Sequence, residues 1–482
     1  MTFLIPALII IVFLVMAALM YTRRVSALLA LPVMALLIAV IGGIPAADIL
    51  NEVIGKGSMK LHNAYTTTMF GAVLAELMNR QGIARALVRW VAEFAGDNPY
   101  ILAMILTLVT ALLFSTLGGL GAVIMVGTIV LPVMLSLGVS NTTAGALYLF
   151  GISLGGMFNL ANWALYIDVL GVEKEKIIAF VIPFSCLIAT VVLLFLALEL
   201  KNWKNSIYFV LGSLFSIGAA FLFCGFGGIG GVNQGADALA KASTSAAVSG
   251  NPLLEVSFQA VLVLTLVLSL LAVLRHRKGN DNLPGMALIT PLVPLILVLG
   301  FGWEIIAAFV FAIIYGVLTT WSRTSVNEIT RSIIDGITTV IPAVFLMIGI
   351  GMLINAVSNE SIAGSIRPLI ATVVPTSPLP YVIVFTILAP LALYRGPLSL
   401  WGMGSGLVKL IQNSTALGGQ AIMGMLMSVG QVQGICDPTN THNIWIATYL
   451  GTDTHALLKK TIAFAWLAVI GGLILACLLG YV

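Results

Sequence analysis

A polar stretch lies between two apolar ones near the end of this sequence, and it reads Gly430-Gln431-Val432-Gln433-Gly434-Ile435-Cys436-Asp437-Pro438-Thr439-Asn440-Thr441-His442-Asn443. The apolar flanks place it within or at the edge of a lipid bilayer, where lipid satisfies no hydrogen bonds. A proline-broken polar backbone is tolerated at that depth only where protein buries it or where it lines a water-filled cavity. Because ionisable groups are costly to bury there, the stretch favours a transport site.

The composition around this stretch is that of a membrane protein. The chain has 482 residues, of which 60% are apolar and 8% charged, and its mean hydropathy is +1.12. Soluble domains carry roughly 25% charged residues, and many stretches here exceed the ~18 apolar residues of a spanning helix. We predict an all-α polytopic membrane protein that keeps its first apolar segment as a span. The net charge of +4 fits basic cytoplasmic loops and does not favour nucleic acid.

Basic residues near the ends of apolar segments predict the orientation of the chain, because Lys and Arg concentrate in cytoplasmic loops. The basic groups are Arg23-Arg24, Arg80 to Arg89, Lys201 to Lys204 and Arg275 to Lys278. If these lie in the cytoplasm, both termini face the periplasm. We therefore expect a multi-pass protein of a bacterial inner membrane with both termini periplasmic.

The two halves of the chain resemble each other at a nearly constant offset. Pro99-Tyr100 and Pro380-Tyr381 each open an apolar helix, and Leu170-Gly171 matches Leu450-Gly451. The basic loops give the halves opposite orientations, which predicts an inverted-topology repeat with re-entrant hairpins and broken transmembrane helices. Such repeats form substrate sites near the bilayer midplane.

This pattern divides the chain into three parts. Residues 1–204 form the first repeat, with a hairpin around 115–121 and a broken helix around 155–163. Residues 205–280 are linking helices with an external loop at 225–255 that is rich in Gly, Ala and Ser. Residues 281–482 form the second repeat, with a hairpin around 394–399 and a broken helix at 430–443.

The hairpin tips are candidate anion sites, because glycines let backbone N–H groups face a bound anion. The candidate residues at the tips are Ser115, Thr116, Gly118 and Gly119 in the first half and Arg395, Gly396 and Ser399 in the second. The Arg395 guanidinium can hold a carboxylate through two hydrogen bonds. Alternatively, Arg395 extends to the membrane interface or pairs with a structural acid.

The broken helices supply uncharged polar side chains, which could bind the polar groups of a substrate other than its carboxylate, or a cation. These candidates are Asn159 and Asn162 in the first half and Thr439, Asn440 and Asn443 in the second. Three further residues are candidates for ion coupling. Asp437 is the first, because burial favours the protonated form of a carboxyl group. His442 is a rival proton carrier, or else a neutral hydrogen-bonding side chain. Asp168 faces either the cavity or a helix interface.

Signatures of catalysis are not found. The sequence has no phosphate-binding loop, no His-Glu-x-x-His motif, and no nucleophile elbow with plausible partners. The four cysteines are scattered through apolar stretches and suggest neither disulfides nor a metal site. We therefore expect no enzyme activity, no cofactor and no metal centre, with a sodium ion as the one candidate bound ion. Without a nucleotide-binding segment, an ion gradient would have to drive transport.

The end of the chain resembles a known family. Asn443-Ile-Trp445, then Tyr449-Leu450-Gly451, then Leu457-Leu-Lys-Lys-Thr461 and an apolar closing helix are similar to the end of gluconate:proton symporters, and less closely to that of citrate–metal:proton symporters. Both belong to the ion transporter superfamily, and the similarity in sequence covers about the last 50 residues. Where gluconate permeases have a His-Val-Asn-Asp-Ser type of stretch, this chain has Asp437 to Asn443. The resemblance implies a homodimeric secondary carrier with a scaffold part and a moving transport part.

The sequence therefore predicts a secondary active transporter that imports a small organic anion, a carboxylate or a sugar acid, by alternating access coupled to protons or sodium. The nearest rival function is that of a sodium/proton antiporter without an organic substrate. Arg395 argues against it, because a cation site gains nothing from a nearby positive charge. A passive channel needs a continuous pore, whereas the paired breaks favour alternating access. A membrane enzyme is the least favoured function, because the sequence shows no nucleophile–base pair.

Overall fold

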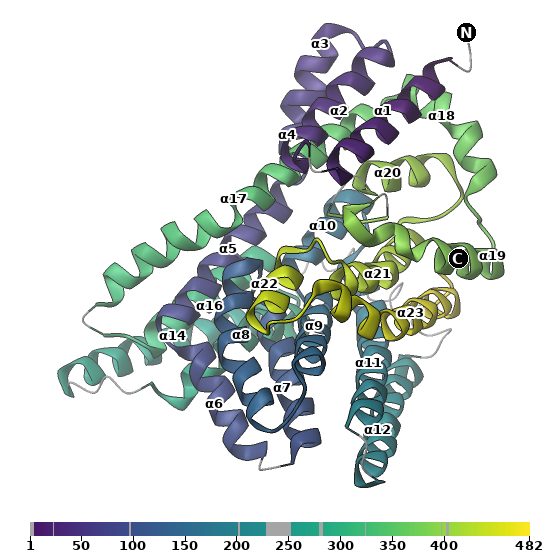
Figure 1. The fold of residues 1–482 in the computed structure, drawn as a ribbon. Helices are drawn as coiled ribbons and strands as arrows, with labels where there is room; N and C mark the ends of the chain where they lie inside the picture. Colours follow the sequence, from purple (N-terminus) through teal and green to yellow (C-terminus); the bar gives the residue numbers. More distant parts are fainter. Residues whose placement is uncertain are drawn as a thin grey trace.

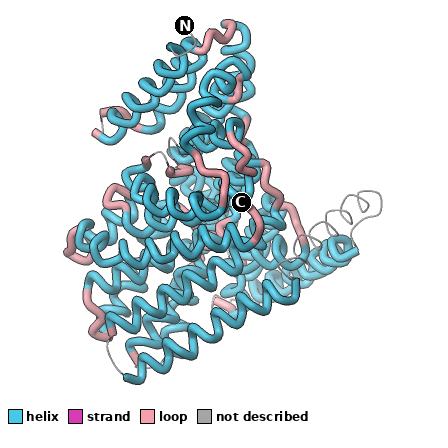
Figure 2. The backbone as a smooth tube through the Cα atoms, turned by 90° about the vertical axis from the view of Figure 1, so that its right-hand side faces the viewer, coloured by secondary structure: helices cyan, strands magenta, loops and turns pink. Residues whose placement is uncertain are grey.

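The structure of the chain is a computed structural model that describes residues 4–22, 24–95, 98–200, 203–227, 252–278, 283–322, 324–396, 398–401 and 404–482. Within these ranges every regular element is a helix (Figures 1 and 2), which confirms the predicted all-α class. Most of the predicted external loop at 225–255 lies outside the described residues.

The first half consists of α1 (Leu4–Tyr21), α2 (Ala27–Ile41), α3 (Ala46–Asp48), the π-helix η1 (Ile49–Lys56), α4 (Gly57–Met59), α5 (His62–Arg80), α6 (Ile83–Ala95), α7 (Pro99–Phe114), α8 (Gly119–Ser136), α9 (Asn141–Met157), α10 (Leu160–Leu170) and α11 (Lys174–Glu199). Two helices follow, α12 (Trp203–Gly227) and α14 (Pro252–Lys278). The second half consists of η2 (Gly285–Leu292), α15 (Val293–Leu295), η3 (Ile296–Gly300), α16 (Ile305–Thr319), α17 (Ser325–Val357), α18 (Glu360–Val373), α19 (Pro378–Leu388), η4 (Ala389–Arg395), α20 (Gly404–Ser414), α21 (Gly419–Cys436), α22 (Thr441–Tyr449) and α23 (Thr454–Leu478).

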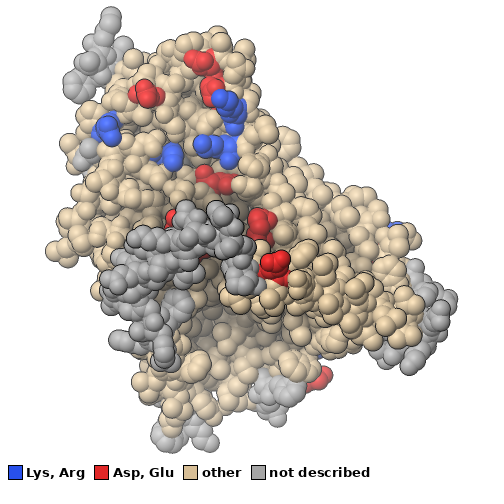
Figure 3. All heavy atoms as spheres, turned by 180° about the vertical axis from the view of Figure 1, so that it is seen from behind, with Lys and Arg blue, Asp and Glu red and all other residues tan. Residues whose placement is uncertain are grey.

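Several of these helices are suited to a bilayer. Five are long and apolar enough to cross it, namely α8, α11, α17, α23 and the Leu253–Leu274 part of α14. A sixth span results if α9 and α10, which are bent by 52° at their junction, count as one. Charged side chains are sparse on the face in Figure 3 and concentrate toward its upper part. The remaining apolar helices are shorter, with 10–17 residues.

Within the described ranges two helices are broken, one in each half, but the second break is shorter than the sequence suggested. The first separates α9 from α10 at Phe158 and Asn159, and the second separates α21 from α22 at 437–440. The expected break began at Gly430, whereas α21 continues to Cys436. Helix is possible there because Gln431, which is 5% exposed, accepts from Ser153 Oγ (2.7 Å) and donates to the carbonyl of Met427 (3.2 Å).

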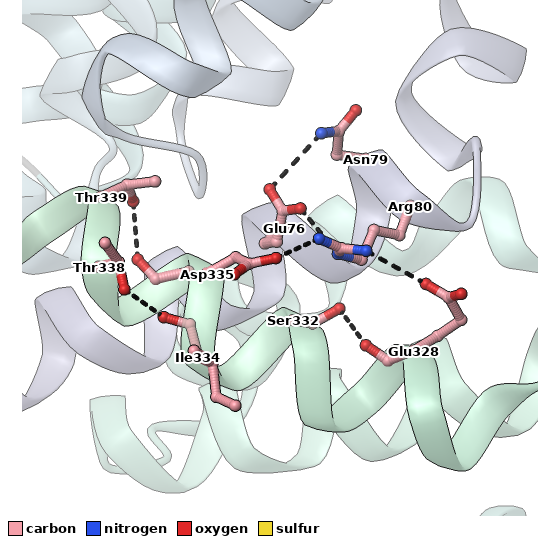
Figure 4. Close-up of polar contacts among 10 residues, drawn as sticks. Glu76, Asn79, Arg80, Glu328, Ser332, Ile334, Asp335, Thr338 and Thr339 are labelled. Atoms are coloured by element: carbon pink, nitrogen blue, oxygen red, sulfur yellow. Dashed lines mark hydrogen bonds and ion pairs between the residues drawn. The ribbon is translucent and has the colours of Figure 1, made fainter.

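Helices α5 and α17 run side by side across the molecule (Figure 1). Their contact is close because Gly336 has no side chain, and a Cβ atom there would lie 2.8 Å from the carbonyl oxygen of Ala72. At one end of the seam Arg80 forms ion pairs with Glu76 (2.8 Å), Glu328 (3.5 Å) and Asp335 (Figure 4). One guanidinium thus joins three carboxylates from two helices.

Replacing Arg80 by Gln is expected to lower the free energy of unfolding by about 1–3 kcal/mol, because it leaves three clustered carboxylates without their cation. Thermal unfolding in detergent measures the change. The control is Arg89→Gln on α6, because Arg89 is exposed and forms no ion pair among the described residues. Equal stability of the two variants would contradict a structural role for the cluster.

Candidate functional site

A cavity of about 350 Å³ lies where the two halves meet, at the small end of the range for ligand pockets. Seven described segments contribute to its wall: α5, the α7–α8 hairpin, the first helix break, α16, α17, the stretch around residue 401, and the start of α22. The lining residues are Thr68, Gly71, Ala72, Phe114, Thr116, Leu117, Gly118, Gly119, Leu120, Val123, Ile152, Gly156, Asn159, Ala161, Asn162, Phe309, Thr339, Val340, Ala343, Trp401, Thr441 and His442.

Three helices begin at this cavity. Gly119 is the first residue of α8, Ala161 and Asn162 lie in the first turn of α10, and Thr441 and His442 open α22. The first N–H groups of a helix have no partner within it, and they carry a partial positive charge. No side chain in the described part of the chain caps α8 or α22. Among the described residues, no Asp, Glu, Lys or Arg lines the cavity.

The glycines at the first hairpin tip allow this arrangement. Gly118 is extended (φ −153°), and Gly119 has a positive φ of 81°, which favours glycine. The tip residues Ser115 and Thr116 are almost fully buried, and their hydroxyl groups donate to backbone carbonyls of Leu112 (2.6 Å) and Leu113 (3.2 Å). With its proton used in this way, the Thr116 hydroxyl can only accept a hydrogen bond from a ligand.

Asn159 holds the hairpin tip to the first helix break. Its Nδ2 group donates to the carbonyls of Phe114 (3.1 Å) and Leu117 (3.0 Å), and its Oδ1 atom accepts from the N–H of Ala161 (3.1 Å). One side chain thus closes the end of α7 and caps the start of α10. Asn162 donates to the carbonyl of Gly156 (2.8 Å), which fixes its amide beside the cavity.

The second break uses the same residue types with different partners. Asn440 and Asn443 stand at the N-cap and third positions of α22, as Asn159 and Asn162 do in α10. Asn440 donates to the carbonyl of Gln433 (2.8 Å), and Asn443 donates to that of Ile435 (3.0 Å). His442 Nε2 lies 3.2 Å from the carbonyl oxygen of Gly434. All three side chains turn back onto the end of α21.

Some of the predicted site residues line the cavity and others do not. Those that line it are Thr116, Gly118, Gly119, Asn159, Asn162 and His442. Those outside the lining are Ser115, Asp168, Gly396, Ser399, Asp437, Thr439, Asn440 and Asn443. Among the latter, the Asp437 carboxylate accepts from the N–H (2.8 Å) and hydroxyl (2.6 Å) of Thr439.

Asp168 lies at a helix interface. Its carboxylate accepts from Asn63 Nδ2 (3.2 Å) and from the N–H of Ala64 (3.1 Å). Ala64 belongs to the first turn of α5, where a carboxylate is favourable. The structure therefore gives Asp168 a role in joining α10 to α5.

The second hairpin tip has an unusual backbone. Tyr394 has a positive φ of 58°, and a side chain at Gly396 would collide with the carbonyl oxygen of Leu391. Ser399 is 1% exposed, which places it inside the protein. The side chain of Arg395 lies outside the described part of the chain.

Sequence reasoning missed several cavity residues, including Thr68, Thr339 and Trp401. Thr68 ends the run Thr66-Thr67-Thr68, and Thr339 follows Thr338 in another apolar helix. Such hydroxyl clusters in apolar helices are the signal that could have indicated them. Trp401 carries no comparable signal.

Searches against protein-family models and curated proteins give no match to this sequence. Among solved structures, the chain is similar to the crystal structure of the YdaH transporter of Alcanivorax borkumensis, which is described as having an unusual topology. The two chains are 14% identical, and the similarity covers 91% of this chain and 90% of that chain with a TM-score of 0.49.

Proposed function

We propose that the protein is a secondary active transporter that carries a small organic anion, a carboxylate or a sugar acid, across the membrane by alternating access. The observation that carries this proposal is the convergence of three helix N-termini on a cavity whose described lining has no acidic residue. Free N–H groups at helix starts bind anions. A site that binds only cations would not be stabilised by the partial positive charges of these helix N-termini.

In this proposal the carboxylate lies against the uncapped N–H groups at the starts of α8 and α22, beside the start of α10, where Asn159 holds the Ala161 N–H. The remaining polar groups of the substrate would donate to the Thr116 hydroxyl and to Asn162 Oδ1, whose own amide proton already serves the Gly156 carbonyl. His442 stands at the start of α22 and would add a titratable contact. The second tip, with Arg395, Gly396 and Ser399, would complete the site in another state of the cycle, together with Thr439, Asn440 and Asn443.

Alternating access would arise from the two halves. The bent pair α9–α10 spans Asn141–Leu170 and is followed by α11, while the pair α21–α22 begins 278 residues later at Gly419 and is followed by α23. We propose that residues 1–204 and 281–482 are inverted repeats joined by residues 205–280. A cation bound at Asp437, sodium or a proton, would drive the cycle. A homodimer in a bacterial inner membrane with periplasmic termini stays a prediction of the sequence.

Anion binding should raise the thermal stability of the purified protein, because ligands that bind only the folded state stabilise it. A panel of mono-, di- and tricarboxylates and sugar acids provides the test. At a hundredfold excess over the dissociation constant the expected gain is about 2.7 kcal/mol. No stabilisation by any of these anions would contradict the proposal.

Thr116→Val should weaken the binding of a stabilising anion about tenfold, because it removes one hydrogen-bond acceptor from the cavity. Thr107→Val is the matched control. Thr107 is also buried, its hydroxyl also donates to a backbone carbonyl (Ala103, 2.8 Å), and it does not line the cavity. Equal weakening in both variants would locate the anion elsewhere. The measurement is the concentration that gives half of the maximal thermal shift.

A further inference from the structure

The two helix breaks differ in how they satisfy buried oxygen atoms. In the first break, the Asn159 amide donates to the carbonyls of Phe114, the last residue of α7, and of Leu117 in the hairpin tip. In the second break, the Asn440 amide donates to the carbonyl of Gln433, which belongs to the preceding helix α21. The second break also contains Asp437, which has no acidic counterpart at Phe158 and Asn159 of the first break.

Two side-chain oxygen atoms in the second break have no hydrogen-bond donor among the described residues. Asp437 is 0% exposed, and the atom concerned is its Oδ2. Asn443 is 2% exposed, and the atom concerned is its Oδ1. Because Asn443 Nδ2 donates to Ile435, its amide lies against the end of α21 from which Asp437 projects. Both atoms therefore lie at the carboxyl end of α21.

A buried carboxylate without a cation is strongly unfavourable. The C-terminal end of α21 adds a partial negative charge at the same place. No Lys or Arg forms an ion pair with Asp437 in the described part of the chain. Two other titratable groups lie at the break: Cys436, whose thiol is 3.3 Å from Thr461 Oγ1, and His442.

We infer that the carboxyl end of α21 binds one monovalent cation, sodium or a proton, between Asp437 Oδ2 and Asn443 Oδ1. The first half has no such site, because Asn159 Nδ2 already donates to the Phe114 and Leu117 carbonyls, which a cation would otherwise contact. The inference rests on the proposed function and assigns its coupling ion to one location with a stoichiometry of one. A single carboxylate matches a single positive charge, whereas a divalent ion would leave an excess charge in a buried site. No described cluster of three His, Cys, Asp or Glu side chains offers a metal site.

The test measures cation-dependent thermal stability of the full chain without any organic anion. Sodium chloride is titrated against choline chloride at constant ionic strength and high pH, and pH is varied in choline chloride. The wild-type protein should gain stability with sodium or with falling pH. Its free energy of unfolding, divided by RT, should rise with the logarithm of the cation concentration with a limiting slope of one. In Asp437→Asn the gain should be lost, with apparent cation affinity reduced about tenfold or more.

Two further variants sharpen the result. Asp168→Asn should keep the cation response, because its carboxylate bonds to Asn63 and Ala64 at the interface of α10 and α5. Asn159→Asp should create a second site beside the Phe114 and Leu117 carbonyls and raise the limiting slope toward two. A response retained in Asp437→Asn, or a slope of two in the wild type, would overturn the inference. A cation response that depends on Asp437 without stabilisation by any anion would overturn the proposed function and leave this site intact.

Discussion

Replacing Gly155 by Ala is expected to lower the free energy of unfolding by about 1–3 kcal/mol and to reduce transport at least tenfold. Gly155 lies on α9 where it crosses α7. A Cβ atom there would collide with the carbonyl oxygen of Ala111 and would approach Phe114 Cβ to 2.8 Å. The backbone of Ala111 cannot rotate away from the added methyl group as a side chain could, so α9 and α7 must move apart. That separation displaces Phe114, whose carbonyl binds Asn159 at the cavity wall.

The neighbouring glycine is the matched control for this prediction. A Cβ atom at Gly156 would meet only Asn162 Nδ2, at 3.9 Å. Gly156→Ala should therefore leave stability unchanged or raise it by up to about 1 kcal/mol, because alanine favours helix. Chemical or thermal unfolding of both variants in detergent gives the comparison. Equal destabilisation by the two substitutions would show that α9 and α7 do not meet as described.

Asn159→Ala is expected to cost about 2.5–8 kcal/mol of stability and to abolish anion binding. The substitution leaves the carbonyls of Phe114 and Leu117 without a donor, at about 1–3 kcal/mol each. It also removes the cap of α10, which contributes about 0.5–2 kcal/mol. The tip and the break would then no longer be held together, and the starts of α8 and α10 would no longer converge on the anion.

Asn98→Ala is the control for the cap alone. Asn98 caps α7 by accepting from the N–H groups of Tyr100 (3.0 Å) and Ile101 (3.4 Å), and it does not line the cavity. Its loss should cost about 0.5–2 kcal/mol and leave anion binding intact. If Asn159→Ala were no more harmful than Asn98→Ala, the hydrogen bonds to the hairpin tip would have no energetic role. Unfolding curves and anion-induced thermal shifts together decide between these outcomes.

Much of the fold follows from the sequence, because apolar length and polar interruptions are strong signals in a membrane protein. The all-α class and the two breaks could be predicted in this way. The extent of the second break could not, since the glutamines after Gly430 look like a polar interruption. They continue α21 because the Ser153 hydroxyl, from a distant helix, satisfies Gln431.

The candidate site was less predictable than the fold. Polar residues within apolar stretches indicated Asn159, Asn162 and His442, and the structure brings these three to one cavity. The walls from α5 and α17 could not be predicted, because their packing depends on contacts such as Gly336 against Ala72. Asp168 illustrates the converse. The sequence did not decide whether Asp168 faces the cavity or a helix interface. In the structure its carboxylate accepts from the N–H of Ala64 at the start of α5.

The most direct test of coupled anion transport is uptake of a labelled anion into proteoliposomes under an imposed inward gradient of sodium or protons. The anion is one that stabilises the purified protein. We predict that it accumulates above its external concentration and that accumulation disappears when an ionophore collapses the gradient. Thr107→Val should retain accumulation and Asn159→Ala should lose it. Entry that only equilibrates the anion, or that is indifferent to both gradients, would contradict the account.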